Sequence, residues 1–383
     1  MDGVTHQYHL SRLYREYQNN SVIALHYNYT GKLSTSRYKG GLKAEAVVFL
    51  VVCVLIVLEN LIVLLALWRN KKFHSPMFYL LGNLTLSDLL AGVAYMVNIV
   101  LSGANTLRLT PVMWFVREGG VFVTLTASIF SLLAIAIERH ITMVRMKLYN
   151  GDKQGRMALL VGASWIVSIL LGVLPILGWN CITNLPSCST ILPLYSKDYI
   201  LFCITIFLAI LISIVVLYLR IYRIVKLNSQ RLVGTLRKGA LRKSQKYMAL
   251  LKTVTIVVGT FIGCWLPLFV LLLSDVSCEV NACPVLLKAD YFLGLAMINS
   301  FLNPIIYTLT SRDIRRAILK LVCFFCFVNE DGETRGRFGF FQVIERSTSK
   351  SEKSSHKQEG LETTISSGNG TPTPVKSLVA KKY

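Results

Sequence analysis

The chain has 383 residues, of which 53% are apolar and 16% charged, and its mean hydropathy is +0.53. A soluble chain carries about a quarter charged residues, so the composition excludes an ordinary soluble domain and indicates a membrane protein. The net charge of +21 lies mostly between and after the apolar runs. It therefore indicates loops facing anionic lipid and argues against a nucleic-acid partner.

Residues 1–43 are polar and form a predicted external N-terminal segment. Asn19 and Asn28 lie in glycosylation sequons there, whereas the sequons at Asn83 and Asn369 fall inside an apolar run and in the far tail. We therefore expect glycosylation at Asn19 and Asn28. Because no apolar signal-peptide region precedes residue 44, we expect the first span to serve as the insertion signal.

Seven apolar runs are long enough to cross a bilayer. They cover residues 44–68, 77–102, 114–144, 157–178, 198–224, 248–274 and 288–310. The sequence thus predicts an all-α membrane protein, with a seven-helix transmembrane domain over residues 44–310. Basic residues gather in the loops after the first, third and fifth runs, which places the N-terminus outside and the C-terminus inside a cell membrane.

The third run carries a charged pair near each end, Arg117-Glu118 and Glu138-Arg139. About 20 residues separate the pairs, or roughly 30 Å along a helix, which is about the thickness of the hydrocarbon core. Charge in this position is costly and usually marks a site or a switch. The alternative is that these side chains only anchor the helix ends at the two interfaces.

Polar residues inside the spans predict a cluster around one carboxylate, Asp88. Burying Asp88 alone would cost several kcal/mol, so the cluster needs partners that hold water or a cation, with sodium near Asp88 and Ser128 as the candidate ion. Its predicted members are Asn60, Asp88, Ser128, Asn299, Ser300 and Asn303. Pro175, Pro267 and Pro304 are expected to bend the fourth, sixth and seventh helices.

After the seventh span, residues 311–327 read as a short basic amphipathic helix on the inner leaflet. Cys323 and Cys326 at its end are palmitoylation candidates, with ordinary free thiols as the alternative. Residues 328–383 hold few apolar side chains and many Ser and Thr residues, so we expect a disordered cytoplasmic tail.

Several stretches resemble known receptor signatures. Those typical of rhodopsin-like G-protein-coupled receptors are 138–140 (ERH), 264–267 (CWLP) and 303–307 (NPIIY). Those that narrow the resemblance to sphingosine 1-phosphate receptors are 26–33 (HYNYTGKL), 117–119 (REG) and 188–195 (CSTILPLY). Residues 117–128 and 292–307 are most similar to subtype 5, and the resemblance covers residues 22 to 325.

The resemblance implies a lipid with an ammonium, a phosphate and one long chain as the ligand. Glu118 would pair with the ammonium and Arg117 with the phosphate, while Lys32 and Tyr27 would cap the phosphate and Asn98 would hydrogen-bond the polar head. The side chains expected to line the cavity of the lipid chain are Phe122, Leu125, Phe207, Trp265, Phe269, Leu272 and Leu293.

The resemblance also implies heterotrimeric G proteins as partners, of the inhibitory class first and the G12/13 class second. Receptor kinases and arrestin would bind the Ser/Thr tail, and no cofactor is expected. The residues expected to carry activation and coupling are Asp88, Glu138, Arg139, Tyr218, Phe261, Asn303 and Tyr307. The inner end of the sixth span offers no carboxylate to Arg139, so Glu138 is its expected resting partner.

The chain departs from the wider receptor class at the top of the third span. Trp114 stands where most members have the cysteine that bridges to the second external loop. The resemblance then implies one disulfide within that loop, Cys181–Cys188, and a second within the next external loop, Cys278–Cys283.

Three other functions fit the sequence less well than a receptor for this lipid. A lysophosphatidate receptor would leave Glu118 unpaired, because that lipid has no ammonium. A retinal-binding pump needs a lysine inside the seventh span, where Lys288 lies only at the mouth. An enzyme or transporter needs a catalytic set or repeated broken helices, and the sequence shows neither, so we predict a receptor and not an enzyme.

Overall fold

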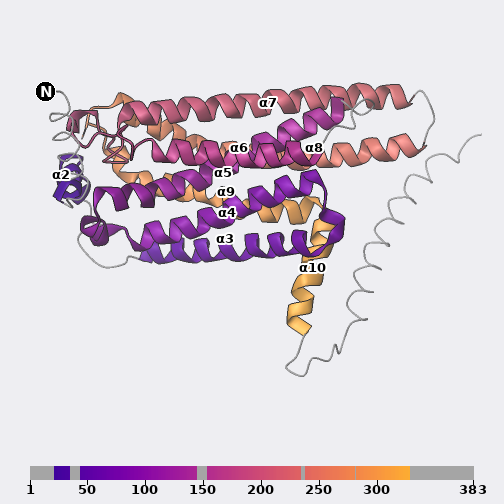
Figure 1. Ribbon diagram of the computed structural model, residues 1–383, viewed down its shortest axis with the longest axis horizontal. Coiled ribbons are helices and arrows are strands. Elements are labelled where there is room, and N and C mark those ends of the chain that lie inside the picture. The colour runs from indigo at the N-terminus through magenta and orange to yellow at the C-terminus, as the bar shows by residue number, and fades with distance from the viewer. Residues whose placement is uncertain (1–20, 35–43, 145–152, 234–237, 281, 328–383) are drawn as a thin grey trace, which may run out of the picture. The chain divides into compact units, whose positions relative to one another are not determined.

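The computed structural model describes residues 21–34, 44–144, 153–233, 238–280 and 282–327. Within these ranges, seven helices are long and apolar enough to cross a membrane, which confirms the predicted architecture. They are α3 (Ala44–Arg69), α4 (Pro76–Val100), α5 (Pro111–Val144), α6 (Lys153–Val173), α7 (Lys197–Val233), α8 (Lys238–Ser277) and α9 (Ala289–Thr310) (Figure 1).

The helix α5 occupies the centre of the bundle and packs against α4, α6 and α7. In its apolar window 61% of the residues are buried, against 22% in α3 and in α6. Among the other helices, α3 packs against α4 and α9, α4 also packs against α6 and α9, and α8 packs against α7 and α9. A helix surrounded by other helices offers buried positions along its whole length, so α5 is where polar side chains from several helices meet.

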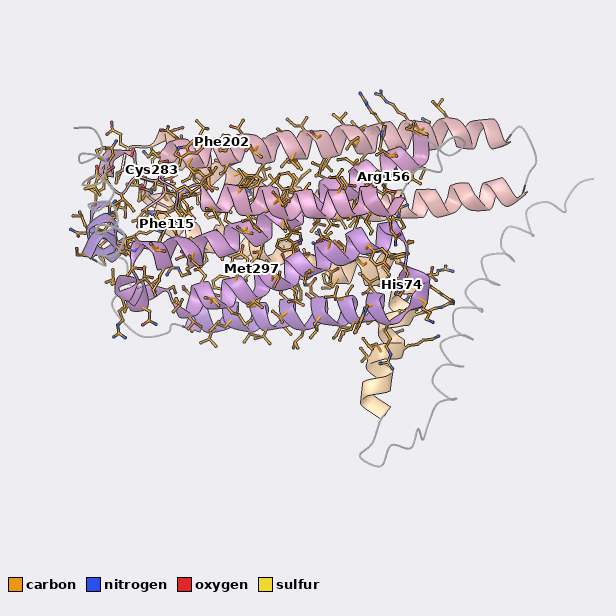
Figure 2. All side chains as sticks on the ribbon, viewed as in Figure 1. His74, Phe115, Arg156, Phe202, Cys283 and Met297 are labelled. Atoms are coloured by element: carbon orange, nitrogen blue, oxygen red, sulfur yellow. A yellow bond between two sulfur atoms is a disulfide. The ribbon has the colours of Figure 1, made fainter. Side chains whose placement is uncertain are left out.

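The bundle has two distinct ends. The N-terminal end holds the short helix α2 (Ser21–Tyr29), the turn η4 (Gly103–Arg108), the loop 174–196 and the turn η6 (Pro284–Lys288) (Figure 1). The opposite end holds the turn η3 (Lys71–Phe73) between α3 and α4. Figure 2 shows Phe115 and Cys283 at the N-terminal end, with Arg156 and His74 towards the opposite end.

Three helix ends differ from the prediction. The helix α6 ends at Val173, so Pro175 lies in the following turn and does not bend a helix as predicted. A residue before proline is disfavoured in the α conformation, which explains the early end. The helix α7 continues to Val233 instead of ending at the predicted residue 224. The helix α8 begins at Lys238, ten residues before the predicted start at 248. In both cases polar helix-forming residues extend the helix past its apolar run.

The helix α2 is an element that the sequence analysis missed. Ile23, His26 and Tyr27 are exposed by only 0%, 1% and 3%. Their spacing of three and four residues places them on one face of the helix, which docks on the N-terminal end of the bundle. The segment was predicted only as polar, because three buried positions in nine residues give too weak a pattern to recognise.

The predicted amphipathic helix is present as α10 (Arg312–Phe327). Ile314, Ala317 and Leu321 lie at helical spacing and are buried in the same core as the bundle. The residues up to 321 form one unit and those from 322 onward another, of which the structure describes the end of α10. The side chains of Cys323 and Cys326, the tail from residue 328 and Asn19 lie outside the described residues.

Candidate functional site

The charged pair near the N-terminal end of α5 is largely shielded from solvent and forms an ion pair. Arg117 Nη2 lies 2.6 Å from Glu118 Oε1, and the two side chains are 4% and 17% exposed. Arg117 Nη1 also donates to the Leu101 carbonyl at 2.7 Å and to Thr106 Oγ1 at 2.9 Å. The loop between α4 and α5 therefore fixes the guanidinium in place, a contact that the sequence analysis did not foresee.

A cluster of aromatic rings covers this pair. Trp114, which is fully buried, donates from Nε1 to the Tyr27 hydroxyl at 2.8 Å, and its ring centroid lies 5.4 Å from those of Phe115 and Tyr195. The Arg117 guanidinium lies 5.9 Å from the centre of the Trp114 ring. Burial raises the pKa of the Tyr27 phenol above its usual value, so the phenol is neutral at physiological pH. The aromatic packing of Trp114 therefore joins α2 to α5 at the position where the cysteine is missing.

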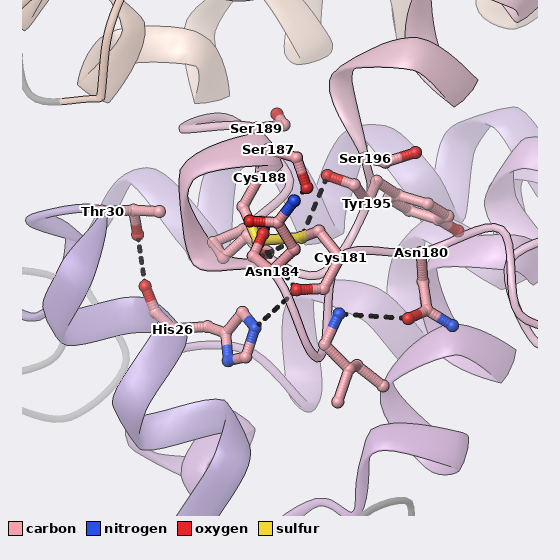
Figure 3. Close-up of a disulfide and its surroundings, with 12 residues drawn as sticks. His26, Thr30, Asn180, Cys181, Asn184, Ser187, Cys188, Ser189, Tyr195 and Ser196 are labelled. Atoms are coloured by element: carbon pink, nitrogen blue, oxygen red, sulfur yellow. Dashed lines mark hydrogen bonds between the residues drawn. A yellow bond between two sulfur atoms is a disulfide. The ribbon is translucent and has the colours of Figure 1, made fainter. Parts of the chain in front are cut away.

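Both predicted disulfides are present. Cys181–Cys188 closes within the loop 174–196 and Cys278–Cys283 within the segment between α8 and α9. Beside the first disulfide, His26 Nε2 forms a 3.3 Å hydrogen bond with the Cys181 carbonyl (Figure 3). Lys32 Nζ donates to the Ile191 carbonyl. The segment that carries Tyr27 and Lys32 is thus held against the loop 174–196 over the N-terminal end of the bundle.

The residues predicted to contact a lipid chain come together deeper in the bundle. The ring of Phe207 lies 5.7 Å from Phe122 and 6.2 Å from Phe269, and Trp265 lies 5.7 Å from Phe269. Leu125, Leu272 and Leu293 are partly buried and pack against the same core. Three helices, α5, α7 and α8, thus contribute to one row of aromatic rings, and Leu293 of α9 packs against the same core.

Two further predicted residues have different surroundings. Phe261 stacks on Trp265 at a centroid distance of 5.6 Å and lies one turn before it in α8. Asn98 on α4 is partly buried and makes no side-chain hydrogen bond among the described residues.

The predicted cluster around Asp88 is formed by three donors. Asp88 is fully buried and accepts hydrogen bonds from Ser128 at 2.9 Å, Ser300 at 3.0 Å and Asn303 at 2.8 Å. Asn60 joins through the Ser300 carbonyl at 3.1 Å. These contacts link α3, α4, α5 and α9 at one level of the bundle.

The cluster has a second carboxylate nearby, which corrects the prediction that Asp88 was alone. Glu59 precedes Asn60 on α3, and its Oε1 is buried with no hydrogen-bond partner among the described residues. The Oδ1 atoms of Asn60, Asn299 and Asn303 are likewise buried without such a partner. Oxygen atoms with unused acceptor capacity around a carboxylate fit water or a hard cation.

At the opposite end of α5 the structure corrects the partner of Glu138. We predicted Arg139, its neighbour in sequence, but the ion pair of Glu138 is formed with Arg156 at the start of α6. Arg156 Nε lies 2.9 Å from Glu138 Oε2 and Nη2 lies 3.1 Å from Oε1. Thr142 also donates to Oε1 at 3.2 Å. The forked geometry satisfies both carboxylate oxygens and joins α5 to α6.

The two tyrosines predicted to take part in activation lie inside the bundle. Tyr218 on α7 and Tyr307 on α9 are 9% and 5% exposed. Each hydroxyl is buried without a hydrogen-bond partner among the described residues. Both therefore keep unused hydrogen-bonding capacity at this level of the bundle.

Comparison with known proteins agrees with this arrangement. Residues 59–307 match the family model described as 7 transmembrane receptor (rhodopsin family). The chain is 53% identical to sphingosine 1-phosphate receptor 1 of Danio rerio over 92% of this chain and 99% of that protein. It is 57% identical to sphingosine 1-phosphate receptor 3 of Takifugu rubripes over 80% of this chain and 79% of that protein.

A human relative has a sequence identity similar to those of the two fish receptors and covers almost the whole chain. Sphingosine 1-phosphate receptor 5 of Homo sapiens is 52% identical over 97% of this chain and 98% of that protein. Relatives named for three subtypes thus show similar identity, and the family comprises receptors rather than enzymes. A multi-pass membrane bundle, two disulfides confined to loops and these relatives agree: the chain belongs to the rhodopsin family of seven-transmembrane receptors and, within it, to the sphingosine 1-phosphate receptors.

Proposed function

We propose that this chain is a cell-membrane receptor that binds sphingosine 1-phosphate on its N-terminal, external face and activates heterotrimeric G proteins at the opposite face. The observation that carries the proposal is the buried Arg117–Glu118 pair next to a row of aromatic rings. Opposite charges beside an apolar interior match a ligand with a zwitterionic head and one long chain. The names of the relatives supply the same ligand.

The polar head of the ligand divides between the two charges. Glu118 takes the ammonium, and Arg117 presents its fork to the phosphate. Lys32 and Tyr27 close over the phosphate from the N-terminal segment, and Asn98 adds a hydrogen bond from α4. Because Arg117 already donates to Leu101 and Thr106, the phosphate meets a guanidinium whose position is set before binding.

The hydrocarbon chain of the ligand lies among Phe122, Phe207, Phe269 and Trp265. Each buried methylene contributes about 0.8 kcal/mol, so a dozen exceed the roughly 5.5 kcal/mol needed to reverse a 1:99 equilibrium. Only the difference in affinity between two receptor states drives the switch. Contacts with Trp265 and Phe261 supply that difference, because both lie on α8 within the two turns before Pro267, where the helix lacks a backbone hydrogen bond.

On activation the cytoplasmic end of α8 swings outward and opens a basic pocket for the C-terminal helix of a G-protein α subunit. Arg139 turns towards Tyr218 and Tyr307, which have hydroxyls available for hydrogen bonds. The inhibitory class of G protein couples first and the G12/13 class second. Asp88, with Ser128 and Asn303, holds water or sodium at the level where α4, α5 and α9 must shift, and the oxygen atoms present there fit such an ion.

With the N-terminus outside and the C-terminus inside the cell, glycosylation falls on the external face, and palmitoylation and further partners on the internal face. Asn28 is exposed on α2 and suits glycosylation on the external face, together with Asn19. Palmitoylation of Cys323 and Cys326 anchors the end of α10 to the inner leaflet. Receptor kinases and arrestin act on the Ser/Thr-rich tail.

Nucleotide exchange on purified G proteins tests this function. Purified receptor in lipid nanodiscs is mixed with an inhibitory-class or G12/13-class heterotrimer, and sphingosine 1-phosphate is compared with lysophosphatidate. We expect saturable stimulation by sphingosine 1-phosphate and at least tenfold weaker potency for lysophosphatidate, whose head leaves Glu118 unpaired. Equal potency of the two lipids, or stimulation by neither, contradicts the proposal.

A further inference from the structure

Another buried carboxylate, Asp275, lies near the C-terminal end of α8 and is used by neither the ligand site nor the switch described above. Its side chain is 0% exposed. The helix dipole is negative at this end, and the last turn of α8 carries no basic residue, so a carboxylate here is electrostatically unfavourable for the helix itself. A buried charge in such a place requires partners from elsewhere in the chain.

Those partners come from the loop that covers the N-terminal end of the bundle. Ser189 Oγ donates to Asp275 Oδ2, and the Thr190 amide donates to Oδ1 at 2.9 Å, across 86 and 85 residues of sequence. Ser189 Oγ in turn accepts a hydrogen bond from the Leu192 amide at 2.8 Å. Asp275 therefore organises the backbone of residues 189–192, which we term the loop latch.

The other side of the loop latch faces the residues that bind the ligand head. Lys32 Nζ donates to the carbonyl of Ile191, whose side chain is 2% exposed and packs with Leu271 and Leu286. The Cys181–Cys188 disulfide ends one residue before Ser189 and limits the movement of that end. Residues 189–192 thus connect the N-terminal cap to α8 through hydrogen bonds on both sides.

We propose that Asp275 is a positioning residue for the ligand: by holding the loop latch on α8, it keeps Lys32 over the polar head and slows release of the lipid. This inference rests on the proposed function, because it assumes that the ligand lies beneath the loop latch. The helix α8 then acts on the site in two ways. Asp275 fixes the loop latch above the ligand, and Trp265 and Phe269 contact the lipid chain.

The test compares dissociation rates of radiolabelled sphingosine 1-phosphate from the full-length receptor in nanodiscs. Asp275→Ala removes both acceptors, and we expect release about tenfold faster, the usual effect of losing hydrogen bonds to a charged group. Asp275→Asn keeps an oxygen for the Thr190 amide and offers an N–H to Ser189 Oγ, so release should stay within about threefold of wild type. Asp198→Asn, an exposed carboxylate at the same end, is the matched control and should leave the rate unchanged.

Hydrogen exchange of the ligand-free receptor separates this role from general instability. The Thr190 and Leu192 amides should exchange faster in Asp275→Ala while amides in the middle of α8 keep wild-type rates. Should Asp275→Ala fail to reach the membrane, the double variant Asp275→Asn with Ser189→Ala leaves only the Thr190 hydrogen bond and should again release the lipid about tenfold faster.

Two outcomes overturn the inference and one overturns the function beneath it. If wild type binds sphingosine 1-phosphate and Asp275→Ala releases it at the wild-type rate, the loop latch does not retain the ligand. Equal acceleration in Asp275→Ala and Asp275→Asn also overturns it, because the hydrogen-bond geometry would then be irrelevant. If wild type shows no saturable binding of this lipid, the proposed function itself fails.

Discussion

Arg117 has three acceptors before any ligand arrives: the Leu101 carbonyl, Thr106 and Glu118. Removing this side chain would take one hydrogen bond from each of the three, so its replacement by alanine disturbs the protein as well as ligand binding. Replacing Glu118 by glutamine separates ligand binding from folding better, because the amide keeps an oxygen that still accepts a hydrogen bond from Arg117. The residue-level test of charge recognition therefore belongs at Glu118.

We predict that Glu118→Gln weakens binding of sphingosine 1-phosphate by tens to thousands-fold, because one partner of a desolvated charge pair is worth about 2–5 kcal/mol. Affinity for lysophosphatidate should improve in the same variant, since the carboxylate that this lipid leaves unpaired is gone. Radioligand binding at equal surface expression measures both effects. Glu279→Gln, at an exposed position of the same end, is the control, and wild-type affinity for both lipids in Glu118→Gln would refute charge recognition.

Trp114 replaces a covalent bridge with packing and one hydrogen bond. We predict that Trp114→Phe lowers the free energy of unfolding by about 1–3 kcal/mol, because the buried Tyr27 hydroxyl loses the hydrogen bond that Trp114 donates. The segment 21–34 should then be cut faster in limited proteolysis, since Trp114 joins it to α5. Trp179→Phe is the control at a side chain that is 38% exposed, and equal cleavage rates in the two variants would rule out this role for Trp114.

The close approach between the helices α5 and α6 depends on glycine, because Gly172 of α6 faces Gly119 of α5. A Cβ atom at position 172 would lie 2.3 Å from Val123 Cγ2 and 3.6 Å from the Gly119 carbonyl oxygen. The two helices can therefore pack at this distance only without a side chain at position 172. Tightly packed interiors do not absorb an extra methyl group without moving their neighbours.

We predict that Gly172→Ala destabilises the receptor by about 1–3 kcal/mol through overpacking. Thermal denaturation in detergent measures the effect. Gly162→Ala, on the same helix with nothing within 4 Å of its added methyl group, should leave the midpoint unchanged. Val123→Ala combined with Gly172→Ala should recover part of the loss, and a lower midpoint in the double variant than in Gly172→Ala alone would mean that the clash is elsewhere.

Across the whole molecule, α5 links a charged pair at the N-terminal end to a second one at the opposite end. Arg156 occupies both oxygens of Glu138, and the two side chains are 22% and 9% exposed, so this ion pair is shielded from solvent in part. The restraint that Glu138 was expected to place on Arg139 is therefore shared with α6. The balance between resting and active states depends on which arginine Glu138 holds.

We predict that Arg156→Gln lowers ligand-independent nucleotide exchange severalfold, because Glu138 becomes available to Arg139. A forked ion pair of this partial burial is worth about 1 kcal/mol, or roughly a fivefold change in an equilibrium. Affinity for sphingosine 1-phosphate should change much less, since the site lies at the other end of the bundle. Basal exchange at the wild-type level would contradict this prediction, and exchange above it would show that the Arg156 pair stabilises the resting state.

We also predict that Arg139→Ala binds ligand with affinity close to wild type but loses nucleotide exchange on the inhibitory-class G protein. The reason is that Arg139 lies near the end of α5 opposite to Arg117 and Glu118, where we propose that the G protein binds. Radioligand binding and exchange measured on the same nanodisc preparation separate the two properties. Wild-type exchange in this variant would remove Arg139 from the coupling mechanism.

The sequence alone predicted the seven spans, both disulfides, the partners of Asp88 and the receptor family. The spans depend on local hydrophobicity, and the disulfides and the family on a resemblance carried by motifs of a few residues, all of which are properties of neighbouring positions. The partners of Asp88 lie 40 to 215 residues away and were predicted only because they are polar residues inside the spans. The extent of α7 and α8 and the end of α6 were predicted less well, because polar residues extend a helix and a proline ends one without changing the apolar run.

The contacts that set the site were decided by tertiary structure. Arg156 meets Glu138 across 18 residues, Tyr27 meets Trp114 across 87 and Ser189 meets Asp275 across 86. Each pair joins separate elements, and its members carry no periodicity that marks them as partners. Only the packing of helices and loops brings such groups within hydrogen-bond distance, because burial makes an unpaired charge costly wherever the fold places it.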